Sequence, residues 1–328
     1  MGLQVLVSAP YLVPLFSRFQ AEFDAAGIAA VMADVRERLS ESDLRRYAGK
    51  IDGVVCGDDR FTAEILEAAA PRLKVISKWG SGVDSIDRQA AARLGVRVFN
   101  TPGAFTDAVA DTVLGYMLAF ARQIPWLDAQ MKAGRWTKLP GRALQECTLG
   151  VVGVGRIGKA VLRRARAFGM ELMGHDIVEV DRSFLDEVGA AMVSLQDLLG
   201  RADFVSLNCD LNPTSRGLID RLALARMKPS AVLINTARGP IIDEKALVEA
   251  LRGERLAGAA LDVFEEEPLA TDSPLRQTDN VLLGPHNANT SPSAWERVHR
   301  ATLGNLFLGL GLAIPQAWRA EAVENGPV

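Results

Sequence analysis

Three segments in the second half of the chain each hold a side chain that could take part in acid–base or anion-binding chemistry. INTARG contains Arg238, LDVFEEEP contains the run Glu265–Glu267, and LLGPHN contains His286. Arginine can bind a carboxylate through two parallel hydrogen bonds and polarise a neighbouring carbonyl. Histidine exchanges a proton near neutral pH, and an adjacent carboxylate would orient its ring and favour the protonated form. Together these residue types fit hydride transfer between an alcohol and a ketone.

Each of these residues also has a plainer interpretation. Arg238 could form a surface ion pair, the glutamate run could lie in a solvated loop, and His286 could cap a turn. The chain contains only three histidines. His175 directly precedes Asp176 at the end of a predicted strand. His299 falls in the middle of a predicted helix, where we expect it to be exposed to solvent. His286 is the histidine that follows a strand on the side where ligands bind.

A glycine-rich loop, Gly153-Val-Gly155-Arg156-Ile157-Gly158, follows the apolar run LGVV and precedes a basic helical stretch. In a dinucleotide-binding loop the first glycine permits a tight turn and the second lets a pyrophosphate approach the backbone. The third lets the helix pack closely on the strand. The helix N-terminus, with Arg156 and Ile157 in its first turn, offers N–H groups to the phosphates. Alone, the pattern indicates no more than a glycine-rich turn.

Asp176 supplies the context that the glycine pattern lacks. It ends the predicted strand MELMGHD, about twenty residues after the loop. A carboxylate there can accept hydrogen bonds from both adenosine ribose hydroxyls and would repel a 2′-phosphate. Asp176 could instead begin a surface turn, but the combination of strand, glycine loop, helix and acidic residue favours a cofactor site. We therefore predict NAD rather than NADP as the cofactor.

Short β-rich runs alternate with helical stretches along the whole chain. The candidate strands are QVLVSA, IDGVVC, LKVISK and VRVFN, followed by LGVVGV, ELMGHD, FVSLN, AVLINT, GAALDV and NVLLG. Continuous apolar strands joined by crossover helices predict parallel sheets covered on both faces. Because ligands bind beyond the carboxyl ends of such strands, the glycine loop and the three chemical segments should meet at one edge.

The mid-chain position of the glycine loop predicts how the domains are organised. About forty residues follow the second series of strands, and the final helix, expected from Ser291 to about Leu312, can return to the first domain. We therefore predict an α/β fold with two doubly wound parallel-sheet domains. The NAD-binding domain is expected at residues 102–287, inserted in a substrate domain made of residues 1–101 and 288–328.

The composition excludes several other classes of protein. The chain has 328 residues, of which 48% are hydrophobic and 23% charged, with a net charge of −3. This composition forms no basic field suited to nucleic acid, and the chain contains no apolar run long enough to span a membrane. Three widely spaced cysteines fit neither a disulfide framework nor a metal site. The N-terminus lacks the features of a signal peptide, so we expect a cytoplasmic protein without a metal ion.

Taken together, the motifs resemble the D-isomer-specific 2-hydroxyacid dehydrogenase family over nearly the whole chain. The resemblance rests on KWGSGVDSID, FNTPGAFTDAVADTVLGYML, MKAGRW, TLGVVGVGRIG, INTARGPIIDEKAL, GAALDVFEEEP and GPHN, which occur in the family's order. It implies a Rossmann domain inserted in a flavodoxin-like substrate domain. It further implies an NAD-dependent oxidoreductase that transfers a hydride between NAD(H) and a D-2-hydroxyacid/2-keto acid pair.

The resemblance also implies a catalytic set of an arginine, a glutamate and a histidine. Arg238 would hold the substrate carboxylate and carbonyl, and His286 would be the acid/base. The family's glutamate directly precedes the proline of its DVFxxEP motif, which here is Glu267. Glu265 and Glu266 would then be bystanders.

Further cofactor and substrate contacts follow from the same resemblance. Asp262 would bind the nicotinamide amide, and Thr236 and Ala237 are expected to contact the cofactor. A loop in the first domain would offer backbone N–H groups to the substrate carboxylate, although its sequence could equally form only a turn. That loop comprises Trp79, Gly80, Ser81 and Gly82.

The family resemblance implies a homodimer in which the region from Asp107 to Trp136 packs across the interface. The residues themselves show only that this region is apolar and helical. Met117, Phe120 and Trp126 could equally belong to an intramolecular core.

The substrate is the least determined feature. The segments FARQIP, MKAGRW and NTARG resemble the phosphoglycerate dehydrogenase-like branch of the family. That branch places a phosphate-binding arginine after the strand equivalent to GVVC, where this chain has Asp58 and Asp59, which would repel a phosphate; Arg60 could reach it but lies several residues further on. Phe105 replaces a polar residue, while Lys78 could supply one positive charge. We therefore expect a small 2-hydroxyacid or 2-keto acid, with 3-phosphoglycerate as the alternative.

Other interpretations stay open on the sequence alone. The histidine segment reads GPHNANTSP rather than the commoner PHxGG, so Asn287 and Asn289 could make unusual polar contacts with the substrate. The same fold could also serve a non-catalytic NAD-sensing scaffold of the corepressor kind, or an enzyme acting on formate or phosphite.

Overall fold

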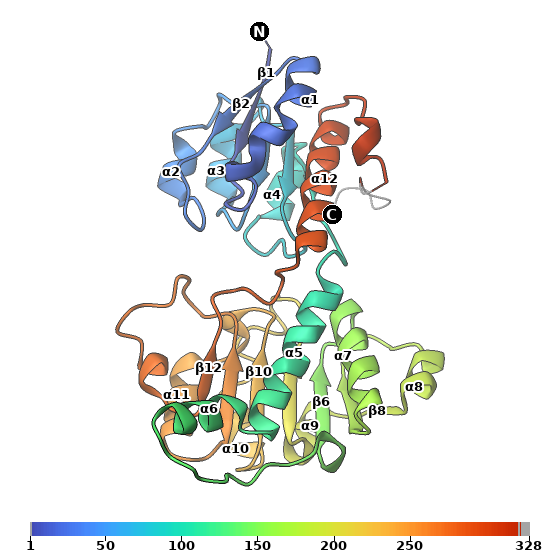
Figure 1. The fold of residues 1–328 in the computed structure, drawn as a ribbon. Coiled ribbons are helices and arrows are strands. Elements are labelled where there is room, and N and C mark those ends of the chain that lie inside the picture. Colours follow the sequence, from blue (N-terminus) through green and yellow to red (C-terminus); the bar gives the residue numbers. More distant parts are fainter. Residues whose placement is uncertain (1, 321, 323–328) are drawn as a thin grey trace. The chain divides into compact units, whose positions relative to one another are not determined.

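The computed structural model describes residues 2–320 and 322 and divides them between two compact units. The first unit comprises Met1–Phe105 and Ser291–Val328, and the second comprises Thr106–Thr290. The chain therefore leaves the first unit once, completes the second, and returns (Figure 1). Both units are built on parallel sheets, as the sequence predicts. No described helix is long and apolar enough to cross a membrane.

The first unit contains a five-stranded parallel sheet in the order β2-β1-β3-β4-β5, which is the flavodoxin-like order. Its strands are β1 (Leu3–Val7), β2 (Ile28–Met32), β3 (Gly53–Cys56), β4 (Val75–Lys78) and β5 (Arg97–Phe99). Its helices are η1 (Val13–Phe19), α1 (Gln20–Ala25), α2 (Glu41–Arg45), α3 (Ala63–Ala69), α4 (Arg88–Arg93), α12 (Pro292–Gly309) and η5 (Gln316–Trp318). Strand β2 was not predicted; it is a short strand at the sheet edge, and its run IAAVM has no alternation of polar and apolar residues.

The terminal helix α12 is part of the first unit and packs on β3, β4 and β5. The Ser77 hydroxyl on β4 donates to the Thr302 carbonyl of this helix at 2.7 Å. His299, which we expected to be exposed, is only 1% exposed. The expectation was wrong because α12 turns this position toward Trp79 at the end of β4, with which His299 forms a hydrogen bond.

The second unit contains a seven-stranded parallel sheet in the order β12-β11-β10-β9-β6-β7-β8. Its strands are β6 (Thr148–Val152), β7 (Glu171–His175), β8 (Ala190–Met192), β9 (Phe204–Leu207), β10 (Val232–Asn235), β11 (Gly258–Leu261) and β12 (Val281–Leu283). The strand order reverses between β6 and β9, which is where a doubly wound sheet binds its ligand. The additional strand relative to the prediction is β8, which is only three residues long.

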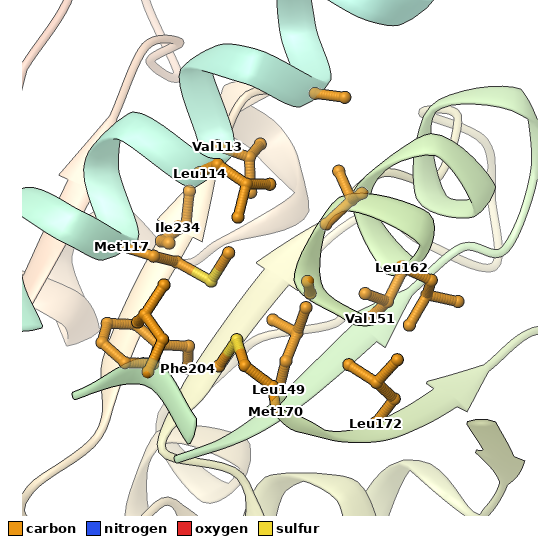
Figure 2. Close-up of a cluster of buried hydrophobic side chains, with 14 of the residues drawn as sticks. Val113, Leu114, Met117, Leu149, Val151, Leu162, Met170, Leu172, Phe204 and Ile234 are labelled. Carbon is orange, nitrogen blue, oxygen red and sulfur yellow. The ribbon is translucent and has the colours of Figure 1, made fainter. Parts of the chain in front are cut away.

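Helices cover both faces of this second sheet. They are α5 (Thr106–Ala121), α6 (Ile124–Lys132), α7 (Arg156–Ala167), α8 (Arg182–Val188), α9 (Leu195–Arg201), α10 (Arg221–Arg226) and α11 (Glu244–Arg252), with three short 3-10 turns, η2 (Leu144–Glu146), η3 (Gly239–Ile241) and η4 (Pro274–Gln277). A buried cluster that includes Met117, Leu162 and Phe204 fills the space between α5, α7 and the sheet (Figure 2). A second cluster, including Leu198, Leu224 and Leu247 of α9, α10 and α11, contains Val205 and Leu233 of the sheet.

These clusters place part of the region after Asp107 in an intramolecular core. Met117 and Phe120 belong to the buried core of the second unit, and Trp126 packs against it. The helix α6, by contrast, contains no buried residue. The apolar side chains that stay exposed in this region are Ile124, Met131 and Trp136.

Candidate active site

The glycine loop joins β6 to α7 in the second unit, and two of its glycines are required by close contacts. Gly153 adopts a left-handed φ of +89°, and a Cβ there would lie 2.5 Å from the Cys209 nitrogen. A Cβ at Gly158 would lie 2.1 Å from the Gly153 carbonyl oxygen. Neither position accepts a side chain, so strand, loop and helix pack as closely as a dinucleotide-binding turn requires.

Gly155 leaves the N-terminus of α7 open. It is the N-cap residue, makes no side-chain capping hydrogen bond, and a Cβ at its position would meet nothing within 4 Å. Arg156 is exposed, whereas the Ile157 side chain packs against the core, which leaves its backbone as the part able to meet a ligand. An open helix N-terminus with free approach to the backbone fits the pyrophosphate of NAD.

Asp176 follows β7 and is held by the glycine loop itself. Its Oδ2 accepts a hydrogen bond from the Val154 N–H at 2.7 Å, and its Oδ1 accepts one from the Val178 N–H at 3.1 Å. A carboxylate oxygen can accept more than one hydrogen bond. Both oxygens therefore retain capacity for ribose hydroxyls while the backbone fixes the orientation of the carboxylate.

Two buried polar atoms lie just beyond neighbouring strands of the same sheet. Asn208 follows β9 and Thr236 follows β10, strands whose register pairs Leu207 with Asn235. The Asn208 Oδ1 and the Thr236 Oγ1 have no hydrogen-bond partner within the described residues. Buried polar groups are nearly always paired, so these atoms fit contacts to a bound cofactor. Asn208 was not among the predicted site residues, and its only signal in the sequence is its position directly after a buried strand.

Asn235 at the end of β10 shapes the turn that carries Arg238. Its Oδ1 accepts from the Ala237 N–H at 3.0 Å, and its Nδ2 donates to the Arg238 carbonyl at 2.9 Å. A Cβ at Gly239 would overlap the Phe264 carbonyl carbon at 1.8 Å. The segments that carry Arg238 and the glutamate run are therefore in backbone contact.

Glu267 and His286 form the central side-chain pair. The His286 Nδ1 lies 2.8 Å from the Glu267 Oε2, and the Glu267 Oε1 accepts from the Phe264 N–H at 3.0 Å. With Nδ1 engaged by a carboxylate, Nε2 is the ring atom left for proton exchange. Glu265 instead accepts from the Glu244 N–H at the start of α11. Geometry thus distinguishes Glu267 from its neighbour Glu265.

Asp262 holds the segment that contains His286. Its Oδ1 and Oδ2 accept from the N–H groups of Asn287 and Ala288 at 3.0 and 2.8 Å, and its carbonyl accepts from the His286 N–H at 2.8 Å. Burial raises the pKa of Asp262, and the two N–H groups oppose that rise. His286 has a left-handed φ of +53°, a conformation that non-glycine residues adopt only when their surroundings impose it.

The loop Trp79–Gly82 lies in the first unit, between β4 and α4. The Trp79 N–H donates to the Cys56 carbonyl at 2.8 Å, and the Gly80 N–H donates to the Thr101 Oγ1 at 3.2 Å. Two of the four N–H groups expected to bind a carboxylate are therefore already engaged. The remaining two belong to Ser81 and Gly82.

The charges beside this loop are paired. Lys78 is buried, and its Nζ lies 3.1 Å from the Asp58 Oδ1 and donates to the Trp79 carbonyl at 3.0 Å. Asp59 is fully buried and accepts from the Leu39 N–H and the Ser8 hydroxyl. Burial raises the pKa of Asp59 to about 6. The charge of Lys78 is thus balanced by Asp58, and the next residue, Asp59, carries a second carboxyl group.

Comparisons with known proteins give a consistent result. Residues 114–288 match the family model described as the NAD binding domain of D-isomer specific 2-hydroxyacid dehydrogenase. The chain is 40% identical to a glyoxylate reductase from Thermofilum pendens over 85% of this chain and 84% of that protein. It is 43% identical to a D-3-phosphoglycerate dehydrogenase from Methanocaldococcus jannaschii over 80% of this chain but only 48% of that relative. A solved D-lactate dehydrogenase from Aquifex aeolicus, complexed with NAD and lactic acid, is 25% identical, has a TM-score of 0.84, and is matched over 98% of both chains.

Replacing Asp176 with Ala should shift cofactor preference from NADH toward NADPH. The variant loses a charged acceptor for the ribose hydroxyls, so NADH binding should weaken by about tenfold or more, while NADPH also escapes charge repulsion. Fluorescence titration with both dinucleotides measures the ratio of dissociation constants. Asp176→Asn is the matched control for loop structure, because its amide oxygen can still accept from the Val154 N–H. An unchanged ratio in Asp176→Ala would show that Asp176 does not contact the ribose.

Proposed function

The chain belongs to the D-isomer-specific 2-hydroxyacid dehydrogenase family, and we propose that its substrate is a small, unphosphorylated 2-keto acid or the corresponding D-2-hydroxyacid. It is an NAD-dependent oxidoreductase acting on CH–OH donors. The observation that carries the proposed chemistry is the 2.8 Å contact between His286 Nδ1 and Glu267 Oε2 in the second unit. The arginine-bearing turn is in backbone contact with the segment before Glu267.

The proposed residues divide the reaction between them. Bound NADH supplies the hydride. Arg238 binds the substrate carboxylate and polarises the carbonyl that is to be reduced. His286 gives the proton on Nε2 to the developing alkoxide, and in the opposite direction it accepts the hydroxyl proton. Glu267 stabilises the imidazolium by its charge, and Asp262 keeps the histidine segment in place through two backbone N–H groups.

In the first unit, the N–H groups of Ser81 and Gly82 are the proposed contacts for the substrate carboxylate. The electrostatics beside them support an unphosphorylated substrate. Lys78 is paired with Asp58, and the neighbouring Asp59 is a second carboxyl group. A phosphate dianion brought to this loop would compete with Asp58 for Lys78, and its charge would be opposed by that of the Asp58 carboxylate. This favours the activity named for the glyoxylate reductase relative over that named for the phosphoglycerate dehydrogenase relative.

A panel of 2-keto acids with NADH tests this function. We expect glyoxylate, hydroxypyruvate or pyruvate to be reduced with a kcat/KM at least about tenfold above that of 3-phosphohydroxypyruvate, since juxtaposed like charges oppose binding. His286→Ala should lose about 10²–10⁴-fold in kcat while NADH affinity changes little. Preference for the phosphorylated acid would replace the proposal with 3-phosphoglycerate dehydrogenase activity. NADH binding without turnover of any acid would favour an NAD-sensing scaffold.

Glu267→Gln should move the alkaline limit of 2-keto acid reduction to lower pH. Reduction needs a protonated imidazole, and without the adjacent negative charge His286 loses its proton at lower pH. The pH dependence of kcat/KM for the reduction measures this limit. Glu266→Gln is the matched control, because it removes the same charge from the exposed neighbour in the same run. If both variants give the wild-type profile, Glu267 does not act on the proton donor.

We further propose that the protein is a homodimer joined through α6 and the segment after it. Helix α6 buries none of its residues, and residues 131–138 are all exposed. Trp136 is 86% exposed, and Ile124 and Met131 lie on the same stretch of chain. Exposed large apolar side chains gathered in one segment are typical of a protein interface, and a second copy is the proposed partner.

Trp136→Ala should weaken dimerisation by at least about tenfold, because buried tryptophans are frequent interface hot spots. Sedimentation velocity over a range of protein concentrations measures the dissociation constant. Leu222→Ala is the control, since Leu222 is an exposed apolar residue on α10, outside the segment. A wild-type protein that stays monomeric at all concentrations would end the dimer proposal.

A further inference from the structure

A buried hydrogen bond joins the start of the Trp79–Gly82 loop to helix α12. The Trp79 Nε1–H donates to the His299 Nδ1 at 3.0 Å, across 220 positions in sequence. Both residues are buried, Trp79 at 4% and His299 at 1% exposure. The proposed reaction does not use this histidine, and the sequence analysis had assigned it to the surface.

The direction of this hydrogen bond fixes the state of the imidazole. An indole N–H can only donate, so the His299 Nδ1 must carry a lone pair and Nε2 must carry the proton. Burial lowers the pKa of His299 to about 4, with Arg18 acting in the same direction and Glu296 against it. The imidazole is therefore neutral at physiological pH, as the contact with Trp79 requires.

This arrangement leaves a buried donor unsatisfied. The His299 Nε2 has no hydrogen-bond partner within the described part of the chain. An unpaired buried donor is unfavourable by about 1–3 kcal/mol, so an apolar residue of similar size would suit a purely structural position better. What histidine provides here, and an apolar residue could not, is the Nδ1 atom that accepts the Trp79 hydrogen bond.

Trp79 is the residue through which α12 reaches the loop. Its backbone is held by the Cys56 carbonyl and by Lys78, whose Nζ donates to the Trp79 carbonyl. Its ring lies 5.4 Å from that of Phe105 and 5.8 Å from that of Trp295, centroid to centroid. The next residue, Gly80, has a φ of +121°. The side chain of Trp79 is therefore fixed immediately before the turn that presents the Ser81 and Gly82 N–H groups.

We propose that His299 is a positioning residue for substrate binding: by accepting the Trp79 indole hydrogen bond, it holds the Trp79–Gly82 loop so that the Ser81 and Gly82 N–H groups can bind the substrate carboxylate. The inference rests on the proposed function of that loop. His299 does not touch the substrate in this proposal. Its effect should appear in the KM for the 2-keto acid, while the steps governed by His286 in the second unit proceed normally.

His299→Asn and His299→Leu form a matched pair that isolates the acceptor. The two side chains have similar size and shape, but only the Asn Oδ1 can replace the His Nδ1 as an acceptor. His299→Leu should raise the KM for the best 2-keto acid about fivefold to tenfold, the effect expected of one lost hydrogen bond, with kcat and the NADH dissociation constant within about twofold of wild type. His299→Asn should stay within about twofold of wild type in all three. Equal KM values for the two variants would overturn the proposal, as would an equal loss in NADH affinity.

A mutant cycle with Trp79→Phe checks that the effect passes through the indole. In the Trp79→Phe background the donor is absent, so His299→Asn and His299→Leu should give the same KM. If they still differ as they do with Trp79 present, His299 acts by another route and the proposal is wrong. Thermal unfolding of all variants identifies any that fail to fold, and the comparison is made among the folded ones.

The indole N–H signal of Trp79 separates a failure of this inference from a failure of the proposed function. In a 15N-labelled protein the signal is assigned by its loss in Trp79→Phe. The chemical shift of this signal should stay the same in His299→Asn, where the hydrogen bond is kept, and should change in His299→Leu, where it is lost. Both results are expected whether or not any 2-keto acid is turned over. An unmoved signal in His299→Leu refutes the hydrogen bond. A moved signal with unchanged KM refutes its role in substrate binding, provided that the wild-type protein reduces the acid.

Discussion

The buried carboxylate of Asp262 organises the end of the second sheet where the proposed chemistry takes place. It accepts the N–H groups of Asn287 and Ala288, and the Asp262 carbonyl accepts that of His286. These three hydrogen bonds hold the segment in which His286 has a left-handed backbone, a conformation uncommon for non-glycine residues. Without this clamp, the imidazole would lose the orientation that brings Nδ1 to Glu267. The expected contact of Asp262 with the nicotinamide amide stays a prediction, since each of its oxygens accepts one backbone N–H and can accept a further hydrogen bond.

Close backbone contacts made possible by glycine connect the other parts of this sheet edge. Gly153 lies against Cys209, Gly158 against Gly153, and Gly239 against Phe264, each at a distance that excludes a Cβ. The cofactor loop is therefore packed closely against the segment after β9, and the turn that carries Arg238 against the segment before Glu267. Such contacts leave little freedom for relative movement, which is the condition that proton and hydride transfer place on their reacting groups. The parallel sheet brings these turns to one edge, and glycine allows them to approach.

The first unit contributes a different kind of constraint, which concerns the choice of substrate. Lys78, the cation nearest the Trp79–Gly82 loop in sequence, is bound by Asp58 and by the Trp79 carbonyl. Aromatic rings of Tyr11, Phe105 and Trp295 surround Trp79. The paired charges and the aromatic surround of this loop support the proposal of a small organic anion, held by backbone N–H groups, over a phosphate ester. The same loop is tied by His299 to a helix from the other end of the chain.

The fold class, the inserted cofactor domain, the family and NAD as the cofactor could all be predicted from the sequence, because each depends on patterns along the chain. Strand periodicity, the spacing from Gly153 to Asp176 and the motif order are all read along the chain. It did not reveal β2 or β8, which are short edge strands with weak patterns. The burial of His299 and the clamping of the histidine segment by Asp262 became visible only in the folded chain, which also places Glu267, the glutamate already named by the family resemblance, 2.8 Å from His286. Those outcomes depend on contacts between residues 19 to 220 positions apart, and such contacts arise from packing rather than from any local preference.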